Sequence, residues 1–476
     1  MGKILAIDLG TTLLKFTLFD RSGGLCDVCR IPTPVAAAAA GRMELPADAF
    51  GEVIVRGIAE LRGRADVGLA DVEAVTFATQ TNSFVLLDAG DRPLTPIILW
   101  PDRRAADLET EVRGRCDVPG FSATTGIPRV SLQFMMAKLL WLQRQLPATW
   151  DQTNRLCLIS DYFTLLLTGK HVTEAGAAGL TGLIDIHRCR WWPEMLTRFA
   201  IDEQRLPSIV RAGTDLGPID LAAAKRLHLP GSCHFVVGCL DQYAGAIGAG
   251  NIAPGMLSET TGTVLATVRC ADRFTAQPRP AVFQGPAFRE GLYWQMTFGD
   301  VSANYLQWYR DQLSDRPEFE QLTALAEPIA PGAEGLRLKP EVALADPRDV
   351  FEGMSTQHTR GRAVRCILET VAVALREQIV TLSDDAMPQE IRCAGGAARS
   401  DLWLQIKADV LNVPTVATTC PEPTSLGAAM LTDAAISRTD LCQIVGQWVS
   451  LKPPHRPDPQ RHQQYVSLYP KSIVSK

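Results

Sequence analysis

Hydrophobic and polar residues alternate with two different periods at the start of the chain. Short apolar runs bounded by turn residues predict three consecutive strands, at residues 3–8, 15–20 and 25–30. From Asp48 to Arg64 the apolar residues instead recur every three to four positions, which predicts an amphipathic helix. The apolar run 74–78 that follows predicts a buried strand. Strands, a helix and a further strand in this order indicate a layered α/β domain.

A similar order of elements recurs in the second half of the chain. The Gly- and Thr-rich segment 258–268 predicts a turn that runs into a strand, and further strands are expected at 292–297 and 391–394. Helical periodicity covers residues 360–382 and 401–411. We therefore predict two α/β halves with a cleft between them.

The boundary between the halves is predicted in a stretch of small residues at 248–251. The first domain then covers residues 1–248 and the second covers residues 249–476. A Pro-rich segment precedes the end of the chain, and the tail 441–476 is a candidate for packing back onto the first domain.

Composition and charge exclude several classes of protein. Hydrophobic residues make up 46% and charged residues 21% of the 476 positions, which is ordinary for a globular protein. The formal net charge is -5, without a basic stripe, so nucleic acid is not expected as a partner. No apolar run approaches the length of a membrane helix, and no membrane association is expected. The twelve scattered cysteines predict reduced thiols and a cytoplasmic location.

Two turns and a glycine pair are candidates for binding a nucleotide. Asp8–Thr12, with Lys15 at the next strand, offers backbone N–H groups and hydroxyls to a phosphate and a carboxylate to a hydrated Mg²⁺. A hairpin turn that merely favours Asp, Gly and Thr is the alternative. The segment 259–263 repeats this chemistry, and Gly395–Ala398 joins a strand to a helix, which suits close approach of a nucleotide. No GxxxxGK sequence exists, which excludes a P-loop.

Three further sets of polar residues follow predicted strands. Asp241 comes after the apolar run 235–237 and before a helix so rich in Gly and Ala that another surface must pack close to it. Its carboxylate could accept a proton from a substrate hydroxyl, or it could simply cap the helix. Residues 80–82 and 100–104 combine amides, hydroxyls, charges and an indole, as a polyol site does. Each of these two sets could also be a solvated loop.

Taken together and in this order, these motifs resemble the FGGY family of carbohydrate kinases, and more particularly its xylulokinase-like branch, over almost the whole chain. Gly238, Asp241, Gly245 and Ala246 match the family's pattern around its catalytic base. The resemblance implies the actin-like ATPase fold, an α/β architecture in which two ribonuclease-H-like domains hold ATP, Mg²⁺ and sugar in the interdomain cleft. It also favours the catalytic interpretation of Asp241.

The resemblance implies a role for each candidate residue. Asp241 would be the catalytic base and Asp8 would hold the metal. The implied sugar-binding residues are Gln80, Thr81, Asn82, Trp100, Asp102, Arg103 and Gln242. The implied ATP-binding residues are Gly10, Thr11, Thr12, Lys15, Thr261, Gly262, Thr263, Gly299, Asn304, Gly395, Gly396, Ala397 and Ser400.

The sequence also departs from the family's xylulokinases. Thr81–Asn82 replaces Met-His, Pro101 replaces the Asn before Asp102, and Asp241–Gln242 is closer to glycerol kinases. We expect ATP-dependent phosphorylation of a terminal hydroxyl of a small sugar, foremost a ketopentose such as xylulose or ribulose. A kinase of glycerol or another short polyol, a non-catalytic member that binds ATP or sugar, and an actin-like ATPase acting on proteins are the alternatives. A homodimer is one candidate assembly of the chain.

Overall fold

The structure is a computed structural model that describes residues 2–37, 41–64, 68–276, 281–339, 350–355, 358–383 and 387–470. Contacts within the chain divide it into two compact units. The first contains Met1–Gly248, Ala271–Trp294 and Glu422–Val449, and the second contains Ala249–Cys270, Gln295–Pro421 and Ser450–Lys476. Each unit is therefore assembled from segments that are distant in the sequence.

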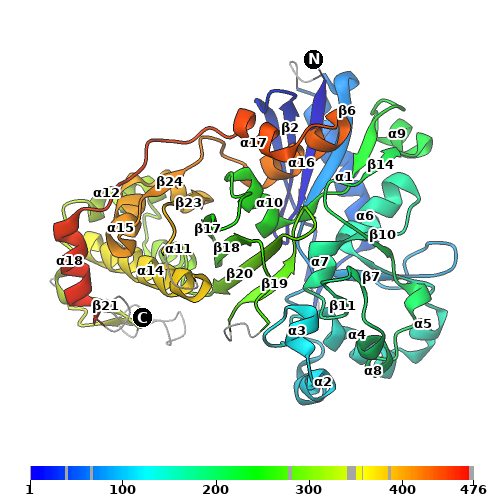
Figure 1. Cartoon of the computed structure of the whole chain (residues 1–476), viewed down its shortest axis with the longest axis horizontal. Helices are drawn as coiled ribbons and strands as arrows, with labels where there is room; N and C mark the ends of the chain where they lie inside the picture. Colours follow the sequence, from blue (N-terminus) through cyan, green and yellow to red (C-terminus); the bar gives the residue numbers. More distant parts are fainter. Residues whose placement is uncertain are drawn as a thin grey trace. The chain divides into compact units, whose positions relative to one another are not determined.

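A seven-stranded sheet forms the centre of the first unit (Figure 1). Its strands are β1 (Lys3–Leu9), β2 (Leu13–Asp20), β3 (Leu25–Pro32), β6 (Val72–Thr79), β14 (Asp215–Pro218), β15 (His234–Val236) and β16 (Cys239–Leu240). Their order is β14–β15–β6–β1–β2–β3, and β16 also pairs with β6. β1 is antiparallel to β2 and parallel to β6. The loops that follow β1 and β6 therefore start at the same edge of the sheet.

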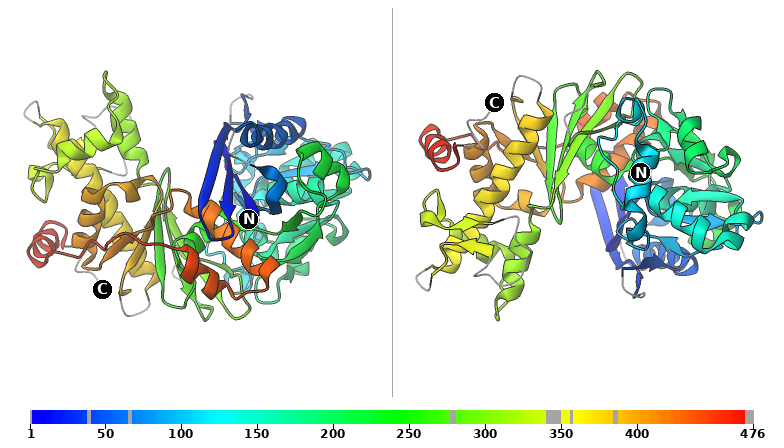
Figure 2. Two further views of the ribbon diagram at one scale, coloured as in Figure 1. Left: turned by 90° about the horizontal axis from the view of Figure 1, so that it is seen from above. Right: turned by 90° about the horizontal axis from the view of Figure 1, so that it is seen from below.

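Helices cover both faces of this sheet. On one face lies α1 (Ala47–Arg62), where a Cβ atom at Gly57 would lie 2.2 Å from the ring of Phe16. On the other lies α16 (Pro423–Ser437), where the hydroxyl of Thr17 donates to Ser425 Oγ at 3.0 Å. Phe16 and Thr17 are consecutive in β2, so their side chains point to opposite faces. The left view of Figure 2 shows α1 (dark blue) and α16 (orange) on opposite sides of the blue strands.

Helix α10 (Asp241–Gly248) packs directly against α16. A Cβ atom at Gly248 would lie 1.8 Å from the carbonyl oxygen of Pro423, and one at Gly427 would lie 1.9 Å from that of Ala244. Neither position has room for a side chain. The prediction that another surface packs close to the Gly- and Ala-rich helix is confirmed.

Smaller elements complete the first unit. A five-stranded sheet has the order β4–β5–β8–β7–β9, and β10–β13 and β11–β12 form pairs. These strands are β4 (Ala36–Ala37), β5 (Met43–Leu45), β7 (Phe84–Leu87), β8 (Ile97–Ile98), β9 (Arg155–Leu158), β10 (Val172–Glu174), β11 (Ile184–Asp185), β12 (Arg190–Trp191) and β13 (Ser208–Val210). The residues of β19 (Phe283–Pro286) also belong to the first unit. The remaining helices are α2 (Glu109–Cys116), α3 (Phe121–Thr125), α4 (Met135–Gln145), α5 (Pro147–Gln152), α6 (Ile159–Thr168), α7 (Ala175–Gly179), α8 (Pro193–Arg198), α9 (Leu221–Leu227) and α17 (Leu441–Trp448).

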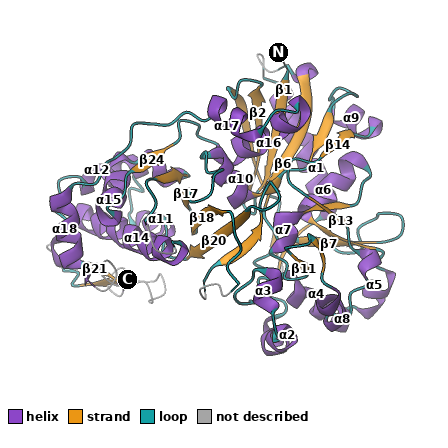
Figure 3. Ribbon diagram, viewed as in Figure 1, coloured by secondary structure: helices purple, strands orange, loops and turns teal. Residues whose placement is uncertain are grey.

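The second unit is built on strands in the order β20–β18–β17–β23–β24, with helices grouped around them (Figure 3). The strands are β17 (Leu257–Thr261), β18 (Leu265–Ala271), β20 (Tyr293–Gly299), β23 (Ile391–Ala394) and β24 (Thr415–Ala417), and β21 (Arg337–Leu338) pairs separately with β22 (Phe351–Glu352). The helices are α11 (Asn304–Gln312), α12 (Phe319–Ala326), α14 (Arg360–Leu382), α15 (Asp401–Leu411) and α18 (Pro459–Leu468).

Both units repeat one strand order. In each, the first two strands form an antiparallel hairpin and the fourth lies parallel to the first, giving β3–β2–β1–β6–β15 and β20–β18–β17–β23–β24. The predicted recurrence of the opening is therefore confirmed. One detail of it was wrong: the segment 258–268 forms a hairpin of two strands rather than a turn and one strand. The polar strand β17 lacks apolar alternation, but its side chains at Glu259 and Thr261 are buried and bonded inside the protein.

The predicted lack of a membrane helix and the predicted reduced thiols can be compared with the structure. No helix among the described residues is long and apolar enough to cross a membrane. All twelve cysteines have free thiols. Within the same described part of the chain, His, Cys, Asp and Glu side chains form no cluster of three or more that could hold a metal ion by themselves.

Candidate active site

The carboxylate of Asp8 lies near the end of β1, at the edge of the first unit's sheet where the loops begin. Lys15 Nζ lies 3.3 Å from Asp8 Oδ2 and 3.3 Å from Glu422 Oε2, and Arg30 also pairs with Glu422. Burial raises the pKa of Asp8, and Lys15 opposes that rise. Glu422, which directly precedes α16, was missed by the sequence analysis. Its only signal was its position before the Leu-Gly-Ala-Ala segment.

A hydrated cation fits beside Asp8. Its Oδ2 faces Lys15, while Oδ1 makes no hydrogen bond or ion pair with any described residue. Mg²⁺ in kinases is usually held by one or two carboxylates together with water and phosphate oxygens, so a single aspartate is a sufficient protein ligand. Asp8 can therefore supply the protein's share of such a site without a larger acidic cluster.

Asp241 is the first residue of α10, immediately after β16, which pairs with the end of β6. Burial raises the pKa of Asp241 to about 7, and the negative charge of Asp8 adds to the rise. Asp241 Oδ1 accepts a hydrogen bond at 2.7 Å from the backbone N–H of Gln242, its immediate neighbour. A helix-capping side chain instead accepts from the second or third residue beyond it. The hydrogen bond that Asp241 accepts is therefore not that of a helix cap.

The loop after β6 is tied to the protein by its own side chains. Thr81 Oγ1 donates to the carbonyl of Ala177 at 2.7 Å, and Asn82 Nδ2 donates to that of Leu180 at 3.0 Å. Asn82 Oδ1 accepts from the N–H of Met135 at 2.9 Å. Asn82 also has a positive φ of 62°, which asparagine tolerates better than most residues. These two candidate sugar ligands thus hold the loop in shape.

Asp102 organises the loop after β8. Its carboxylate accepts hydrogen bonds from the backbone N–H groups of Met43 and Arg104 and from the Arg104 guanidinium, at 2.7 to 2.9 Å. Burial opposes ionisation, but the bonds from Arg104 prevail and lower the pKa of Asp102. The side chain of Arg103 is exposed, in contrast to that of Arg104.

A buried lysine, to which the sequence analysis assigned no role, supports the same loop. Lys138 in α4 is fully buried, and its Nζ donates to the carbonyls of Trp100 and Gln133 at 2.9 and 2.8 Å. Burial lowers the pKa of Lys138 to about 7. A neutral amine still has two N–H donors, so both bonds persist whether or not the group is charged.

A pocket of about 940 Å³ in the second unit gathers most of the predicted nucleotide-binding residues of that unit. Of the predicted residues, those that line it are Thr261, Gly262, Thr263, Asn304, Gly396, Ala397 and Ser400. Gly395 has a φ of 80° and packs against Thr260 and Thr261. Gly299 is not among the lining residues. Trp308, Trp403 and Phe319 add aromatic wall, which suits a nucleobase.

A buried ion pair supports the loop at one end of this pocket. Lys407 Nζ lies 2.7 Å from Glu259 Oε1 and donates to Thr261 Oγ1 at 2.9 Å, and Thr261 donates to Glu259 Oε2 at 2.6 Å. The side chains of Lys407 and Glu259 are both fully buried. The hydroxyl hydrogen of Thr261 is therefore used inside the protein, whereas Thr263 is in the turn itself. A lysine between apolar residues of α15 was the signal that sequence analysis passed over.

Lys407→Met should destabilise the second unit strongly, because it leaves the Glu259 carboxylate buried without a partner. We expect the free energy of unfolding to fall by about 3 kcal/mol. Lys452→Met is the matched control, since Lys452 is exposed in the same unit and its loss should cost less than about 0.5 kcal/mol. Calorimetric melting of the two variants measures the difference. Equal melting temperatures would show that the pair contributes nothing.

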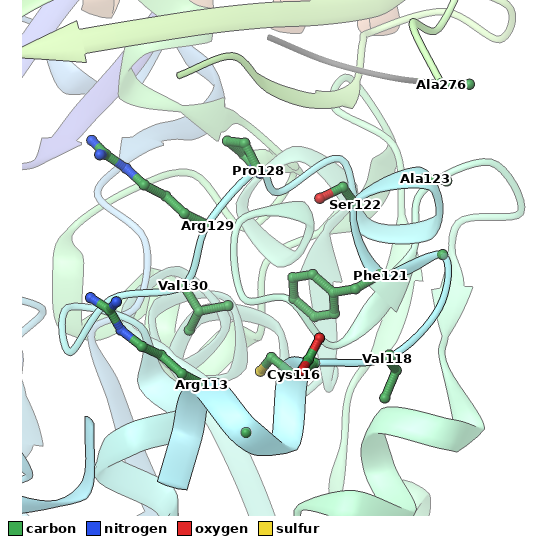
Figure 4. Close-up of a pocket in the computed structure, with 13 residues that line it drawn as sticks. Arg113, Cys116, Val118, Phe121, Ser122, Ala123, Pro128, Arg129, Val130 and Ala276 are labelled. Carbon is green, nitrogen blue, oxygen red and sulfur yellow. The ribbon is translucent and has the colours of Figure 1, made fainter. Parts of the chain in front are cut away.

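A different pocket, of about 810 Å³, lies in the first unit between α2 and α3. Phe121 and Val130 line it, and Arg113 and Arg129 extend in the same direction from its side (Figure 4). Both arginines are exposed, and Arg113 pairs with Glu109. None of the predicted site residues lines this pocket.

Comparison with protein families identifies both halves of the chain. The N-terminal domain model of the FGGY family of carbohydrate kinases matches residues 3–248, and the C-terminal domain model matches residues 260–436. A xylulose kinase of Lactococcus lactis is 28% identical over 90% of this chain and 87% of its own length. A glycerol kinase of Janthinobacterium sp. is 27% identical over 94% of this chain and 92% of its own.

Solved structures share the architecture. The xylulose kinase of Lactobacillus acidophilus covers 100% of this chain and 97% of its own, with a TM-score of 0.87 and 24% identity. The xylulose kinase of Rhodospirillum rubrum covers 99% and 98%, with a TM-score of 0.86 and 27% identity. Together with the repeated strand order, these matches confirm the predicted actin-like ATPase fold.

Proposed function

Because the chain belongs to the FGGY family of carbohydrate kinases and is of its xylulokinase-like type, we propose that it phosphorylates a terminal hydroxyl of a ketopentose, such as xylulose or ribulose, at the expense of ATP. The observation that carries the chemistry is the pair Asp8 and Asp241. Burial raises the pKa of Asp241 to about 7, and the negative charge of Asp8 contributes to this rise. One group is then poised to take a proton and the other to attract a cation.

Asp241 acts as the general base in this proposal. Its carboxylate accepts the proton of the attacking hydroxyl while the phosphoryl group is transferred, and a base with a pKa near the working pH performs this best. Positioning and charge stabilisation do the rest, since the transferring phosphoryl group needs little covalent help. Gln80, Thr81, Asn82, Trp100, Asp102, Arg103 and Gln242 are proposed to form or support the sugar site.

The proposed phosphate-binding residues lie in two turns, one in each unit. Gly10, Thr12 and Lys15 in the first unit, and Gly262 and Thr263 in the second, offer backbone or side-chain donors to phosphates. The pocket at Asn304, Gly396, Ala397 and Ser400 takes the adenosine. Gly299 and Gly395, which precede these residues in the sequence, are assigned to the same nucleotide site. Mg²⁺ beside Asp8 would neutralise phosphate charge. The free thiols of all twelve cysteines support a cytoplasmic place of action.

A substrate panel tests the proposed sugar. We expect D-xylulose or D-ribulose to give a higher kcat/KM than any aldohexose when ADP release is measured with a coupled assay. Glycerol is the second candidate, because Asp241–Gln242 is the pair expected of glycerol kinases and a glycerol kinase is among the relatives. If an aldohexose gave the highest kcat/KM, the proposal of a ketopentose substrate would be rejected. If the protein phosphorylated none of the sugars and polyols tested, the proposed kinase activity would be rejected.

A further inference from the structure

Three loops of the first unit meet where β1, β6 and β8 end. β1 and β6 are parallel neighbours, so the residues after them lie at the same sheet edge. Thr11 belongs to the first loop, Gln80 and Ser83 to the second, and Trp100 follows β8. These four residues, here called the Thr11 network, come from the proposed phosphate turn and from the proposed sugar site.

Hydrogen bonds close the Thr11 network into a circuit. The indole N–H of Trp100 donates to Thr11 Oγ1 at 2.9 Å, and the Thr11 hydroxyl donates to Gln80 Oε1 at 3.0 Å. The Ser83 hydroxyl donates to the same Oε1 at 2.8 Å and accepts from the backbone N–H of Trp100 at 2.9 Å. The indole of Trp100 is thus held by the loop after β1, and the backbone of Trp100 is held by the loop after β6.

The direction of each bond follows from the chemistry of the groups. Gln80 Nε2 donates to the carbonyl of Leu9 at 3.2 Å, so Gln80 Oε1 must be the acceptor for Thr11 and Ser83. An indole N–H can only donate, so Thr11 Oγ1 accepts from Trp100. A hydroxyl has one hydrogen, and that of Thr11 is already given to Gln80. Thr11 can donate to a phosphate only by breaking the circuit.

The neighbouring residue Thr12 differs from Thr11 in its exposure and in its hydrogen bonding. Thr12 is exposed, and its hydroxyl makes no hydrogen bond with any described residue. The backbone carbonyl of Thr12 accepts a hydrogen bond from the N–H of Thr33 at 2.9 Å. A threonine pair in one turn therefore contains one hydroxyl that is committed and one that is free.

We propose that Thr11 is a positioning residue for the sugar: its hydroxyl holds the Trp100 indole as a rigid wall of the sugar site, and phosphate binding in this turn is left to Thr12 and the backbone. The proposal rests on the proposed function in placing the sugar against Trp100. It divides the Asp8–Thr12 turn between the two substrates. A fixed indole presents its apolar face without first losing rotational freedom when the sugar binds.

Thr11→Val tests this division, because valine has nearly the same shape and cannot hydrogen-bond. We expect the KM for the sugar to rise about fivefold, as the loss of one hydrogen bond allows. The KM for ATP and kcat should stay within about twofold of wild type. Thr12→Val is the matched control in the same turn, and it should raise the KM for ATP while leaving that for the sugar unchanged.

Trp100→Phe provides a second route, since it keeps an aromatic wall but removes the N–H. It should raise the sugar KM in the same way, and the double variant Thr11→Val with Trp100→Phe should be no worse than either single one, because both remove the same bond. Thr11→Val would overturn the proposal if it raised the KM for ATP as much as that for the sugar, or if it changed neither. Full additivity of the two substitutions would also overturn it.

A readout without turnover separates this inference from the proposed function. In an NMR spectrum of the ¹⁵N-labelled full chain, the Trp100 indole N–H signal is identified by its loss in Trp100→Phe. Thr11→Val should shift that signal, and an unshifted signal would overturn the inference. If the wild type phosphorylates no sugar while the shift is observed, the proposed function fails and the Thr11 network stands.

Discussion

Asp241→Asn should lower kcat by about 10² or more while the protein still binds sugar and Mg-ATP within a few-fold of wild type. Asparagine keeps the shape of the side chain and an oxygen that can accept the hydrogen bond of Gln242 N–H, but it cannot take a proton at neutral pH. Purified variant and wild type are compared by coupled ADP release, with a titration of sugar binding alongside.

The control for this substitution is an aspartate that does cap a helix. Asp220 is exposed before α9 and accepts hydrogen bonds from the N–H groups of Ala222 and Ala223. Asp220→Asn should leave kcat unchanged, because an amide caps almost as well as an acid. If Asp241→Asn behaved like Asp220→Asn, Asp241 would lose its role as the base.

The pH dependence provides a second readout of the same group. The pKa of Asp241 is raised to about 7, and only its ionised form accepts a proton. The kcat/KM of the wild type should therefore rise with pH up to about 7 and level off above it. The residual activity of Asp241→Asn should lack this acid limb. A wild-type profile that is flat down to pH 5 would contradict the assignment.

Asp8→Ala should abolish turnover without unfolding the protein. The substitution removes the carboxylate that we propose as the protein ligand of Mg²⁺ and leaves Lys15 paired with Glu422 alone. Excess EDTA should stop the wild type in the same way, and added Mg²⁺ should restore it. Activity is measured by coupled ADP release across a range of Mg²⁺ concentrations.

Asp27→Ala is the matched control for Asp8→Ala. Asp27 lies in β3, in the same antiparallel meander, and pairs with Arg64 near the surface. Because pairs of this kind contribute little, its loss should affect neither activity nor melting temperature appreciably. Undiminished turnover of Asp8→Ala, or of the wild type in EDTA, would remove the metal from the proposal.

Local sequence was sufficient where local residues decide the structure. Helices α14 and α15 begin and end as predicted because periodic apolar residues continue to their ends and Thr359 and Ser400 cap their first turns. The close packing of α10 was also predictable, since a run of Gly and Ala leaves no other way to bury a helix. The polar strand β17 was not predicted, because its alternation depends on partners elsewhere in the chain.

Tertiary structure alone decided which charges meet. Nothing near Lys15 in the sequence predicts Glu422, and nothing near Glu259 predicts Lys407. The same holds for Glu369, which receives hydrogen bonds from Arg365 in its own helix but also from Tyr465 in α18. Buried charges need a partner, yet one sequence carries no distances and cannot say which of many residues supplies it.

The types of residue needed for phosphoryl transfer were therefore readable from the sequence, and the tasks of the individual side chains were not. Thr11 and Thr12 are two threonines in adjacent positions, and Thr261 and Thr263 are separated by a single glycine. Packing gives Thr11 to Trp100 and Gln80 and gives Thr261 to Glu259 and Lys407. A hydroxyl has a single hydrogen to donate, so the neighbours that the fold brings to it determine whether a ligand can use it.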